Sequence, residues 1–443
     1  MNQQSHVPAE PITQELTHVT DILDELQWRG SVAQCTDDTA LRAAFASGPV
    51  TAYCGFDPTA PSLHFGNFVQ LVVLRRLQRA GHRVICLVGG STGLIGDPRP
   101  TSERVLKSKD EAAANVERIK SLVRPFLDFE GTDPQCAHPA ILVNNLDWTE
   151  PLSALDFLRE IGKHFRVNQM IRKEAVAARL ESQEGISYTE FSYQLLQALD
   201  FLHLYQAYGC TLQTGGSDQW GNLTAGVDLV HKVEGVSVHA LTTPLLTDSS
   251  GQKFGKSEGN AVWLSADMTS PYAFYQYFLN VEDASVLTLL KIFTDLDQAQ
   301  LAAIEAQVAA EPFRRTAQRT LATEVTTLVH GAQVTAAVEA ASAAIFGKGA
   351  LTELDEATLL DATAELPGGQ VPVGASIVEA LVATGLVDSR NAARRVLAEG
   401  GVSLNNVKVT DAEATLAAGD FLHGRVALLR RGRKAQAVAR RPT

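Results

Sequence analysis

The chain has 443 residues, 45% of them hydrophobic and 20% charged, which is ordinary for a soluble globular protein of about two to four domains. No run approaches the roughly 18 apolar residues of a membrane span, and the acidic segment 1–30 is unlike a signal peptide. The five cysteines include no Cys-x-x-Cys pair, which argues against a disulfide framework or a metal site and favours the reducing cytoplasm.

The net charge of −12 is unevenly distributed along the chain. Residues 421–443 contain seven Lys or Arg and no Asp or Glu, so residues 1–420 carry −19. A basic end on an acidic body can direct RNA to one place and repel it elsewhere. A solubilising tail is the alternative.

Residues 53–67 join a β-prone run, 49–56, to an amphipathic helical run, 65–80. Turn-forming residues lie between them, so the pattern predicts a strand, a turn and a helix opened by His64. His64 and Asn67 share one face of the first helical turn, where free N–H groups and the helix dipole favour phosphate. The alternative is that His64 only caps a surface helix.

A second strand is predicted over 84–88, before the glycine-rich loop 89–97, and a third over 141–143. This order predicts a parallel sheet that binds nucleotide beyond the carboxyl ends of its strands. The glycine spacing is not that of a P-loop. Residues 102–130 are expected to be helical.

Three further segments have polar residues in suggestive positions. Tyr193, Gln197 and Asp200 share one helix face, which either faces solvent or lines a pocket for a small polar ligand. In 215–222, glycines precede Asp218, which could accept from ribose hydroxyls or cap a helix. The segment 251–257 places Lys253 and Lys256 among glycines, as a mobile cationic loop or an ordinary solvated turn.

The character of the chain changes after residue 270. Residues 271–347 are alanine-rich and helical in pattern, and 364–370 has the composition of a linker. In the remaining module, 389–402 predicts a helix that ends at glycines, and 402–409 predicts a hairpin centred on Asn405 and Asn406.

Taken together, these motifs resemble a known family over nearly the whole chain. Residues 53–67 resemble the first signature of the class I aminoacyl-tRNA synthetases, and 251–257 resemble the second. The string from Tyr53 to Asn67, the Tyr193 row and the octapeptide 215–222 are similar to the bacterial tyrosyl enzymes. Residues 162–168 resemble the dimer-interface region of that family, and the C-terminal module resembles an RNA-binding domain shared with a ribosomal small-subunit protein.

The resemblance implies an α/β fold: a Rossmann-like parallel-sheet catalytic domain, an α-helical domain and a small α+β RNA-binding domain. The expected ranges are 1–270 for the catalytic domain, 271–355 for the helical anticodon-side domain, 356–374 for a linker and 375–443 for the basic domain. The implied activity is tyrosine activation by ATP, with Mg²⁺ accompanying ATP, followed by transfer of tyrosine to its tRNA. We expect no tightly bound cofactor, no metal site and no membrane association. We expect a cytoplasmic homodimer.

The resemblance also assigns the site residues. The implied catalytic residues are His64, Asn67, Thr59, Lys253 and Lys256. The implied tyrosine-binding residues are Tyr53, Asp97, Tyr193, Gln197, Asp200 and Gln219, with Tyr193 and Gln197 at the ammonium group and Asp200 at the phenol. The implied ATP-binding residues are Cys54, Gly55, Asp57, His64, Gly66, Asn67, Gly216, Asp218, Lys253, Lys256 and Ser257, with Cys54 and Asp218 at the ribose. The implied RNA-binding residues are Arg394, Arg395, Arg430, Arg431, Arg433 and Lys434.

One departure from the family pattern follows Asp97. The family often has a lysine after Asp-Pro, whereas this chain has Arg99-Pro100-Thr101, so Arg99 or Arg104 is the candidate replacement. Two alternatives stay open. One is a tryptophan–tRNA ligase, against which Tyr53 and Asp200 argue because its pocket has no phenol to satisfy. The other is an RNA-binding or splicing protein built on a synthetase scaffold.

Overall fold

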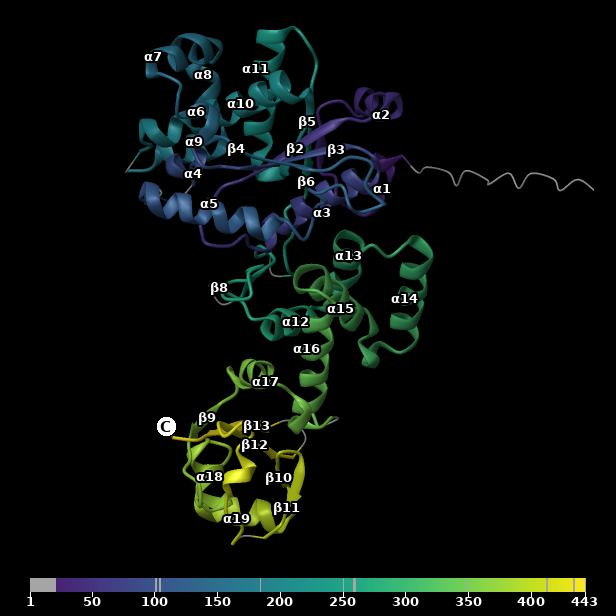
Figure 1. Cartoon of the computed structure of the whole chain (residues 1–443), viewed down its shortest axis with the longest axis vertical. Helices are drawn as coiled ribbons and strands as arrows, with labels where there is room; N and C mark the ends of the chain where they lie inside the picture. The colour runs from purple at the N-terminus through teal and green to yellow at the C-terminus, as the bar shows by residue number, and fades with distance from the viewer. Residues whose placement is uncertain are drawn as a thin grey trace, which may run out of the picture.

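The computed structural model describes residues 21–99, 102, 105–183, 185–249, 251–257, 260–347, 349–411, 413–432 and 435–442. Three parts follow one another along an elongated molecule: an α/β part, a group of helices and a small part with its own sheet (Figure 1). The fold class predicted from the sequence is thereby confirmed. Among these residues, no helix is both long and apolar enough to cross a membrane.

The first part is built on a six-stranded sheet in the order β1-β6-β5-β2-β3-β4. Neighbouring strands from β6 to β4 run parallel, and β1 pairs antiparallel with β6 at the edge. From β2 the chain moves to β3 and β4 on one side, then returns to β5 on the other. The order therefore reverses between β2 and β5, which is where open α/β sheets bind their ligands. The strands are β1 (Gln34–Cys35), β2 (Thr51–Phe56), β3 (Arg83–Val88), β4 (Ile141–Asn144), β5 (Cys210–Gly216) and β6 (His239–Thr243).

Helices cover both faces of this sheet, and β2 shows how the sequence directs this (Figure 1). Successive side chains of a strand point to opposite faces. Cys54 accordingly joins the apolar cluster that contains α3, whereas Tyr53 joins the cluster that contains α10. The helices of this part are α1 (Ile22–Trp28), α2 (Asp38–Ser47), α3 (Phe65–Arg79), α4 (Thr92–Ile95), α5 (Lys109–Val123), α6 (Leu146–Thr149), α7 (Ala154–Asp156), α8 (Val167–Met170), α9 (Glu174–Glu181), α10 (Tyr188–Tyr208) and α11 (Trp220–Glu234).

Local signals set the ends of these helices. Gly81, with φ of +89°, follows α3 and ends it in a conformation that other residues rarely adopt. The helix predicted over 102–130 is shorter, because Ser108 caps α5 by accepting a hydrogen bond from the backbone N–H of Glu111 at 3.1 Å.

The second part consists of helices that pack against α3 through aromatic rings. Phe65 lies 4.5 Å from Phe293 and 5.2 Å from Phe278 between ring centroids, and Phe68 stacks on Phe293 at 5.1 Å. These rings belong to the same buried cluster as the α3 face of the sheet, so one core spans both parts. The helices are α12 (Pro271–Leu279), α13 (Asp283–Phe293), α14 (Gln298–Ala310), α15 (Thr316–His330) and α16 (Ala332–Ile345).

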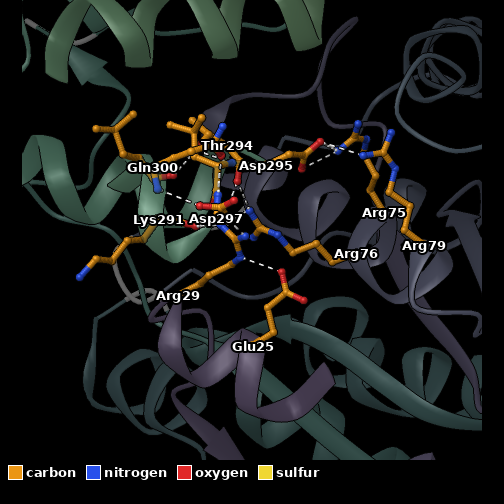
Figure 2. Close-up of polar contacts among 12 residues, drawn as sticks. Glu25, Arg29, Arg75, Arg76, Arg79, Lys291, Thr294, Asp295, Asp297 and Gln300 are labelled. Atoms are coloured by element: carbon orange, nitrogen blue, oxygen red, sulfur yellow. Dashed lines mark hydrogen bonds and ion pairs between the residues drawn. The ribbon is translucent and has the colours of Figure 1, made fainter. Parts of the chain in front are cut away.

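A cluster of arginines also joins the two parts at the end of α13, as Figure 2 shows. Arg29 donates to the backbone oxygens of Lys291 and Thr294, each at 3.0 Å, and to that of Leu296 at 3.1 Å. Arg76 donates to the Thr294 oxygen at 2.8 Å. Both guanidinium groups are buried. They donate hydrogen bonds to carbonyl groups that the end of α13 leaves without helical partners.

The outer edge of this contact is an ion-pair cluster. Arg75 and Arg79 of α3 pair with Asp295 at 2.6 and 2.8 Å. Deeper in, burial beside the charge of Arg29 lowers the pKa of Arg76 to about 9. The buried arginines therefore hold the inner side of the contact between the two parts, and the partly exposed ion pairs hold its outer edge.

The third part has a five-stranded sheet in the order β11-β10-β12-β13-β9. Asn405 and Asn406 join β10 to β11 with φ of 46° and 69°, the left-handed turn that Asn tolerates, so the predicted hairpin is confirmed. The elements are β9 (Gly368–Gln370), β10 (Val402–Leu404), β11 (Val407–Val409), β12 (Val426–Arg431), β13 (Ala435–Arg440), α18 (Ile377–Ala383) and α19 (Arg390–Ala398).

The structure differs from the sequence analysis over 356–374, where a linker is expected. That range contains helix α17 (Glu356–Thr363) and strand β9, which pairs parallel with β13. Leu359 is buried in a cluster with Ile345 of α16 and Leu428 of β12. The apolar residues of this segment are few, but they complete a buried contact between the second and third parts.

Polar side chains of the third part cap the end of α16. Asn406 donates to the Ala344 oxygen and Gln436 to the Ile345 oxygen, each at 2.7 Å. Arg430 also donates to the Ile345 oxygen, at 3.3 Å. The third part is thus held against α16 by hydrogen bonds to carbonyl groups that would otherwise lack partners.

We predict that the buried arginines stabilise the contact between the first two parts more than the outer ion pairs do. Arg29→Ala should lower the free energy of unfolding in urea by about 2–4 kcal/mol, because it leaves buried carbonyl groups unpaired. Arg75→Ala, the matched control, should cost only about 1 kcal/mol, since its partner Asp295 is half exposed and still pairs with Arg79. Equal losses would contradict this account of the contact.

Candidate functional site

The polar residues singled out in the sequence gather where the strand order reverses. They come from the end of β2, the start of α3, the loop 89–97, the middle of α10 and the turn from β5 into α11. The loop 247–257 reaches the same region, because Lys253 lies 3.4 Å from Asp218 between Nζ and Oδ2. The C-terminal arginines lie in the third part, and the Cys54 thiol faces α3, away from this region.

At the deep end of the site, Asp200 is held by two donors. Its Oδ1 accepts from the Trp148 indole at 2.9 Å, and its Oδ2 accepts from the Asn145 amide at 3.0 Å. Asp200 is 2% exposed, and burial raises its pKa to about 7 despite both hydrogen bonds. The carboxyl group therefore sits in an apolar setting that makes its charge costly.

Tyr53 lies on β2 beside this carboxyl group. Its ring packs on Phe201 with centroids 5.3 Å apart, and burial together with the charge of Asp200 raises its pKa well above the ordinary value. Its hydroxyl remains a neutral donor at physiological pH.

Among the buried polar atoms that have no hydrogen-bond partner within the described part of the chain, three belong to the site: Tyr53 Oη, Gln197 Oε1 and Gln213 Oε1. Buried polar groups are nearly always paired, and leaving one unpaired costs about 1–3 kcal/mol. Since they belong to neighbouring elements β2, β5 and α10, they outline a position where a polar ligand or water would meet them.

A chain of hydrogen bonds connects the two carboxyl groups of the pocket. Tyr193 donates to Asp57 Oδ2 at 2.8 Å, and Thr92 donates to Asp57 Oδ1 at 2.6 Å. Asn145 donates to both Thr92 and Asp200, each at 3.0 Å. Gly89 makes this approach possible, because a Cβ there would lie 2.0 Å from Asp57 Oδ1.

A second network surrounds Asp97. Gln219 donates to Asp97 Oδ2 at 3.0 Å, and Asn222 donates to Asp97 Oδ1 at 3.1 Å and to Gln219 Oε1 at 2.9 Å. Lys173 donates to Asn222 Oδ1 at 2.6 Å, and burial lowers the pKa of this lysine to about 7. Gln219 and Asp97 are thus held in fixed orientations.

The start of α3 presents its first turn to the open side of the site. His64 is the N-cap residue and is exposed, and Asn67 Oδ1 accepts from the His64 backbone N–H at 3.3 Å. A Cβ on Gly66 would lie 2.9 Å from the His64 ring, so glycine at this position avoids a clash with that ring. Thr59 is exposed in the preceding turn, and its backbone N–H donates to the Asp57 oxygen at 2.8 Å.

The turn after β5 places Asp218 on the same side. A Cβ on Gly216 would lie 2.6 Å from Asp218 Oδ1, which accounts for glycine at that position. The ion pair of Asp218 with Lys253 is half exposed on both sides and so holds the loop weakly. Lys256 and Ser257 form the short strand β7 (Lys256–Ser257), paired with β8 (Asn260–Ala261).

Other predicted residues lie differently. The Cys54 thiol faces α3, with Sγ 3.9 Å from Gln70 Oε1, and burial raises its pKa to about 12, so only its backbone faces the pocket edge with Gly55. Arg99 is exposed, and its backbone oxygen accepts from the buried Arg179 at 3.3 Å. Arg104 and Thr101 lie outside the described residues.

The described members of the predicted RNA-binding set lie on two elements of the third part, α19 and β12. Arg394 and Arg395 are exposed on α19, and Arg431 is exposed at the end of β12. Arg430 instead contacts Asn406 and the Ile345 oxygen at the α16 contact. Arg433 and Lys434 lie outside the described residues.

The sequence analysis gave no role to several residues of the site. Asn145 and Trp148 hold Asp200, Thr92 joins the two carboxyl groups, and Lys173 fixes Asn222. Gln213 carried the clearest signal, since it is an amide next to Leu212 inside a strand that is mostly buried. The others become recognisable only when distant segments meet.

A parallel sheet whose strand order reverses beside a buried polar cluster, with a histidine-opened helix and a two-lysine loop next to it, is the architecture of a class I tRNA synthetase. The family model of the class I tRNA synthetases for tryptophan and tyrosine matches residues 46–347. A second model, the C-terminal domain of tyrosine–tRNA ligases of the SYY-like type, matches residues 359–439.

Curated relatives match over almost the full length. The tyrosine–tRNA ligase of Streptomyces coelicolor is 60% identical over 94% of this chain and 98% of its own, and that of Acidothermus cellulolyticus is 56% identical over 96% and 100%. Among solved structures, a C-terminally truncated mitochondrial tyrosyl-tRNA synthetase of Aspergillus nidulans superposes with a TM-score of 0.65 at 32% identity, covering 72% of this chain and 92% of its own. The chain belongs to the tyrosine–tRNA ligase family.

We predict a pH-dependent stability contribution from Asp200. The folded state raises its pKa from 3.8 to about 7, so folding favours the protonated form. Stability from this residue is therefore fully present below pH 3.8 and is lost as pH rises to about 7, by up to about 4 kcal/mol.

The measurement is urea unfolding of the native chain and of Asp200→Asn, a neutral isostere, between pH 5 and pH 8. The native chain should lose stability relative to the variant as pH rises. If the difference in unfolding free energy between the native chain and the variant is constant over this range, folding does not raise the pKa of Asp200 as described.

Proposed function

We propose that this chain activates L-tyrosine with ATP, forming tyrosyl-adenylate and pyrophosphate, and then transfers tyrosine to the 3′ end of its tRNA. The observation that carries the choice of amino acid is the buried pair of Tyr53 and Asp200. A buried phenol oxygen without a partner among the described residues, close to a buried carboxyl group and within an apolar cluster, suits a ligand with a hydroxyl at the end of an aromatic ring. The relatives that match almost the full length of the chain are tyrosine–tRNA ligases, which also favours tyrosine over tryptophan as the substrate.

The remaining pocket groups fit the polar end of the amino acid. Tyr193, Gln197, Asp97 and Gln219 would surround the ammonium group, and the unpaired Gln197 oxygen is a suitable acceptor for it. Asp57 would hold Tyr193 in place through the 2.8 Å hydrogen bond. Hydrogen bonds among these side chains already orient them. Tyrosine binding should therefore cost little further side-chain entropy.

Activation needs no nucleophile from the protein. The carboxylate of tyrosine attacks the α-phosphorus of ATP and pyrophosphate leaves, so the protein contributes positioning and charge stabilisation. His64, Asn67 and Thr59 would donate to the phosphates, and Lys253 and Lys256 would close over the pyrophosphate. Mg²⁺ enters with ATP as part of the substrate. Asp218, Gly216 and the backbone at Cys54 and Gly55 would accommodate the ribose.

The C-terminal part is proposed to bind the tRNA. Arg394, Arg395 and Arg431 are exposed there, on a body that is otherwise acidic. Arg430 would act indirectly, because its guanidinium holds the domain against α16. The buried contact at α17 suggests that the domain presents these cations at a set distance from the pocket.

We propose a cytoplasmic homodimer. Leu155 and Leu158, near the predicted interface segment 162–168, are 79% and 50% exposed, and Val167 is 62% exposed. Large apolar side chains gathered on one exposed segment are typical of a protein contact. Five free cysteines suit the reducing cytoplasm.

Tyr53→Phe tests the choice of amino acid. Tyrosyl enzymes are themselves the known example of rejecting phenylalanine by about 10⁵ without editing, because buried polar groups are left unpaired. Removing one of those groups should narrow the tyrosine-to-phenylalanine ratio in ATP–pyrophosphate exchange by about tenfold, the value of one hydrogen bond. The control is Tyr208→Phe on the same helix as Asp200, and an unchanged ratio in Tyr53→Phe would place the phenol elsewhere.

His64→Ala tests the phosphate side. Loss of one transition-state donor typically costs about 3–4 kcal/mol, so the rate constant for exchange should fall by about 10²- to 10³-fold, with normal tyrosine affinity. His231→Ala, at an exposed position on α11, is the control and should leave the rate unchanged. A loss of less than tenfold in His64→Ala would remove His64 from this role.

A further inference from the structure

The loop that carries Lys253 and Lys256 meets the core of the protein at Phe254 and Gly255, while Ser249 and Lys253 pair with Glu282 and Asp218 nearer the surface. The Phe254 backbone N–H donates to the Leu246 oxygen at 2.8 Å, and its ring lies 5.1 Å from that of Phe65, the first residue of α3. The two signature segments of the sequence are therefore in direct contact at this point.

Gly255 is enclosed on several sides. Its φ is +84°, and a Cβ there would lie 2.7 Å from the Phe65 Cβ, so only glycine fits. Its carbonyl oxygen accepts from Val262 N–H at 2.8 Å, and the Val262 oxygen accepts from Phe65 N–H at 3.0 Å. These bonds join the loop to the first turn of α3, which begins at His64.

The remaining backbone group of Gly255 has a partner in another part of the protein. Its N–H donates to the hydroxyl oxygen of Tyr277 at 2.8 Å. Tyr277 belongs to α12, and its ring also meets Phe254 edge-on at 5.3 Å. The hydroxyl is thus placed between the loop on one side and the helical part on the other.

We propose that Tyr277 is a positioning residue for tyrosine activation, through the hydrogen bond that its hydroxyl accepts from the backbone of Gly255. The bond fixes the backbone of the turn between Lys253 and Lys256, and so the course of the loop on which the two lysines stand. The inference rests on the proposed role of these lysines.

Geometry separates this role from simple packing. The aromatic contacts of Phe254 with Phe65 and Tyr277 need only rings, and a phenylalanine at 277 keeps them. The outer end of the loop is held by the half-exposed pair of Lys253 with Asp218, which contributes little. The hydroxyl of Tyr277 therefore supplies a directional constraint that the rings do not.

The same bond links the loop to the tRNA side of the molecule. Helix α12 packs in the helical part, where Gln276 donates to Ser342 of α16 at 2.9 Å. A shift of α12 relative to the sheet would change the direction of the Tyr277 hydroxyl and with it the loop.

The test is single-turnover adenylate formation by Tyr277→Phe in the full chain, with tyrosine affinity measured separately. The rate constant should fall by about three- to tenfold, the equivalent of one ordinary hydrogen bond, while the dissociation constant for tyrosine stays within about twofold. Tyr275→Phe is the matched control, because it is buried on the same helix and its hydroxyl pairs with Thr323 instead. Hydrogen exchange at the Gly255 amide should become faster in Tyr277→Phe alone.

An unchanged rate constant in Tyr277→Phe overturns the proposal, and so does a parallel loss of tyrosine affinity or an equal effect of Tyr275→Phe. Lys253→Ala separates the proposed role of Tyr277 from the proposed role of the loop. If Lys253→Ala is slow and Tyr277→Phe is not, the positioning role alone fails. If Lys253→Ala is as fast as the native chain, the proposed role of the loop fails and the positioning role with it.

Discussion

Helix α3 is the element on which the rest of this structure depends. Its first turn faces the pocket at His64, its apolar face carries Phe65 and Phe68 into the core shared with the helical part, and its last turns carry the arginines that bind the end of α13. A rigid helix that ends at the reaction site and at the domain contact fixes both relative to the sheet. The phosphate side of the pocket and the helical part therefore share one frame, and the loop at Gly255 is attached to that same frame through Phe65.

The pocket is assembled at a cost to stability. Asp200 is buried where its charge is unfavourable, and the polar atoms of Tyr53, Gln197 and Gln213 are left without partners in the described structure. A core built for stability alone would place apolar side chains there. Such features are typical of sites whose ligand completes the hydrogen bonding. The surrounding networks, from Asp57 to Asp200 and from Lys173 to Asp97, keep the carboxyl groups of the site in fixed directions.

Sequence reasoning succeeded where local pattern decides the structure. The unit of β2, turn and α3, the helix that carries Tyr193 and Asp200, and the hairpin at Asn405 and Asn406 all follow from periodicity and turn chemistry. Such patterns contain the information within a few residues of the element itself.

It failed where contacts between distant segments decide. Nothing near Trp148 indicates that its indole meets Asp200 across 52 positions of sequence. The linker-like composition of 364–370 supports a linker over 356–374, yet Leu359 is buried because α16 and β12 meet there. Arg430 reads as one cation of a basic tail, whereas its guanidinium lies against the end of α16. Lys256 and Ser257 show the same limit, since the pattern places them in a loop and the structure pairs them as a short strand.

The central claim is that the unpaired buried groups and the two signature segments enclose one tyrosine and one ATP. The measurement that tests it most directly is a crystal structure of the chain with L-tyrosine and a non-hydrolysable ATP analogue. We expect the phenol oxygen within hydrogen-bond distance of Tyr53 Oη and Asp200, the ammonium group near Tyr193 and Gln197, and the phosphates between the start of α3 and the Lys253 loop. A tyrosine whose ring points toward solvent, or phosphates bound away from His64, would contradict it.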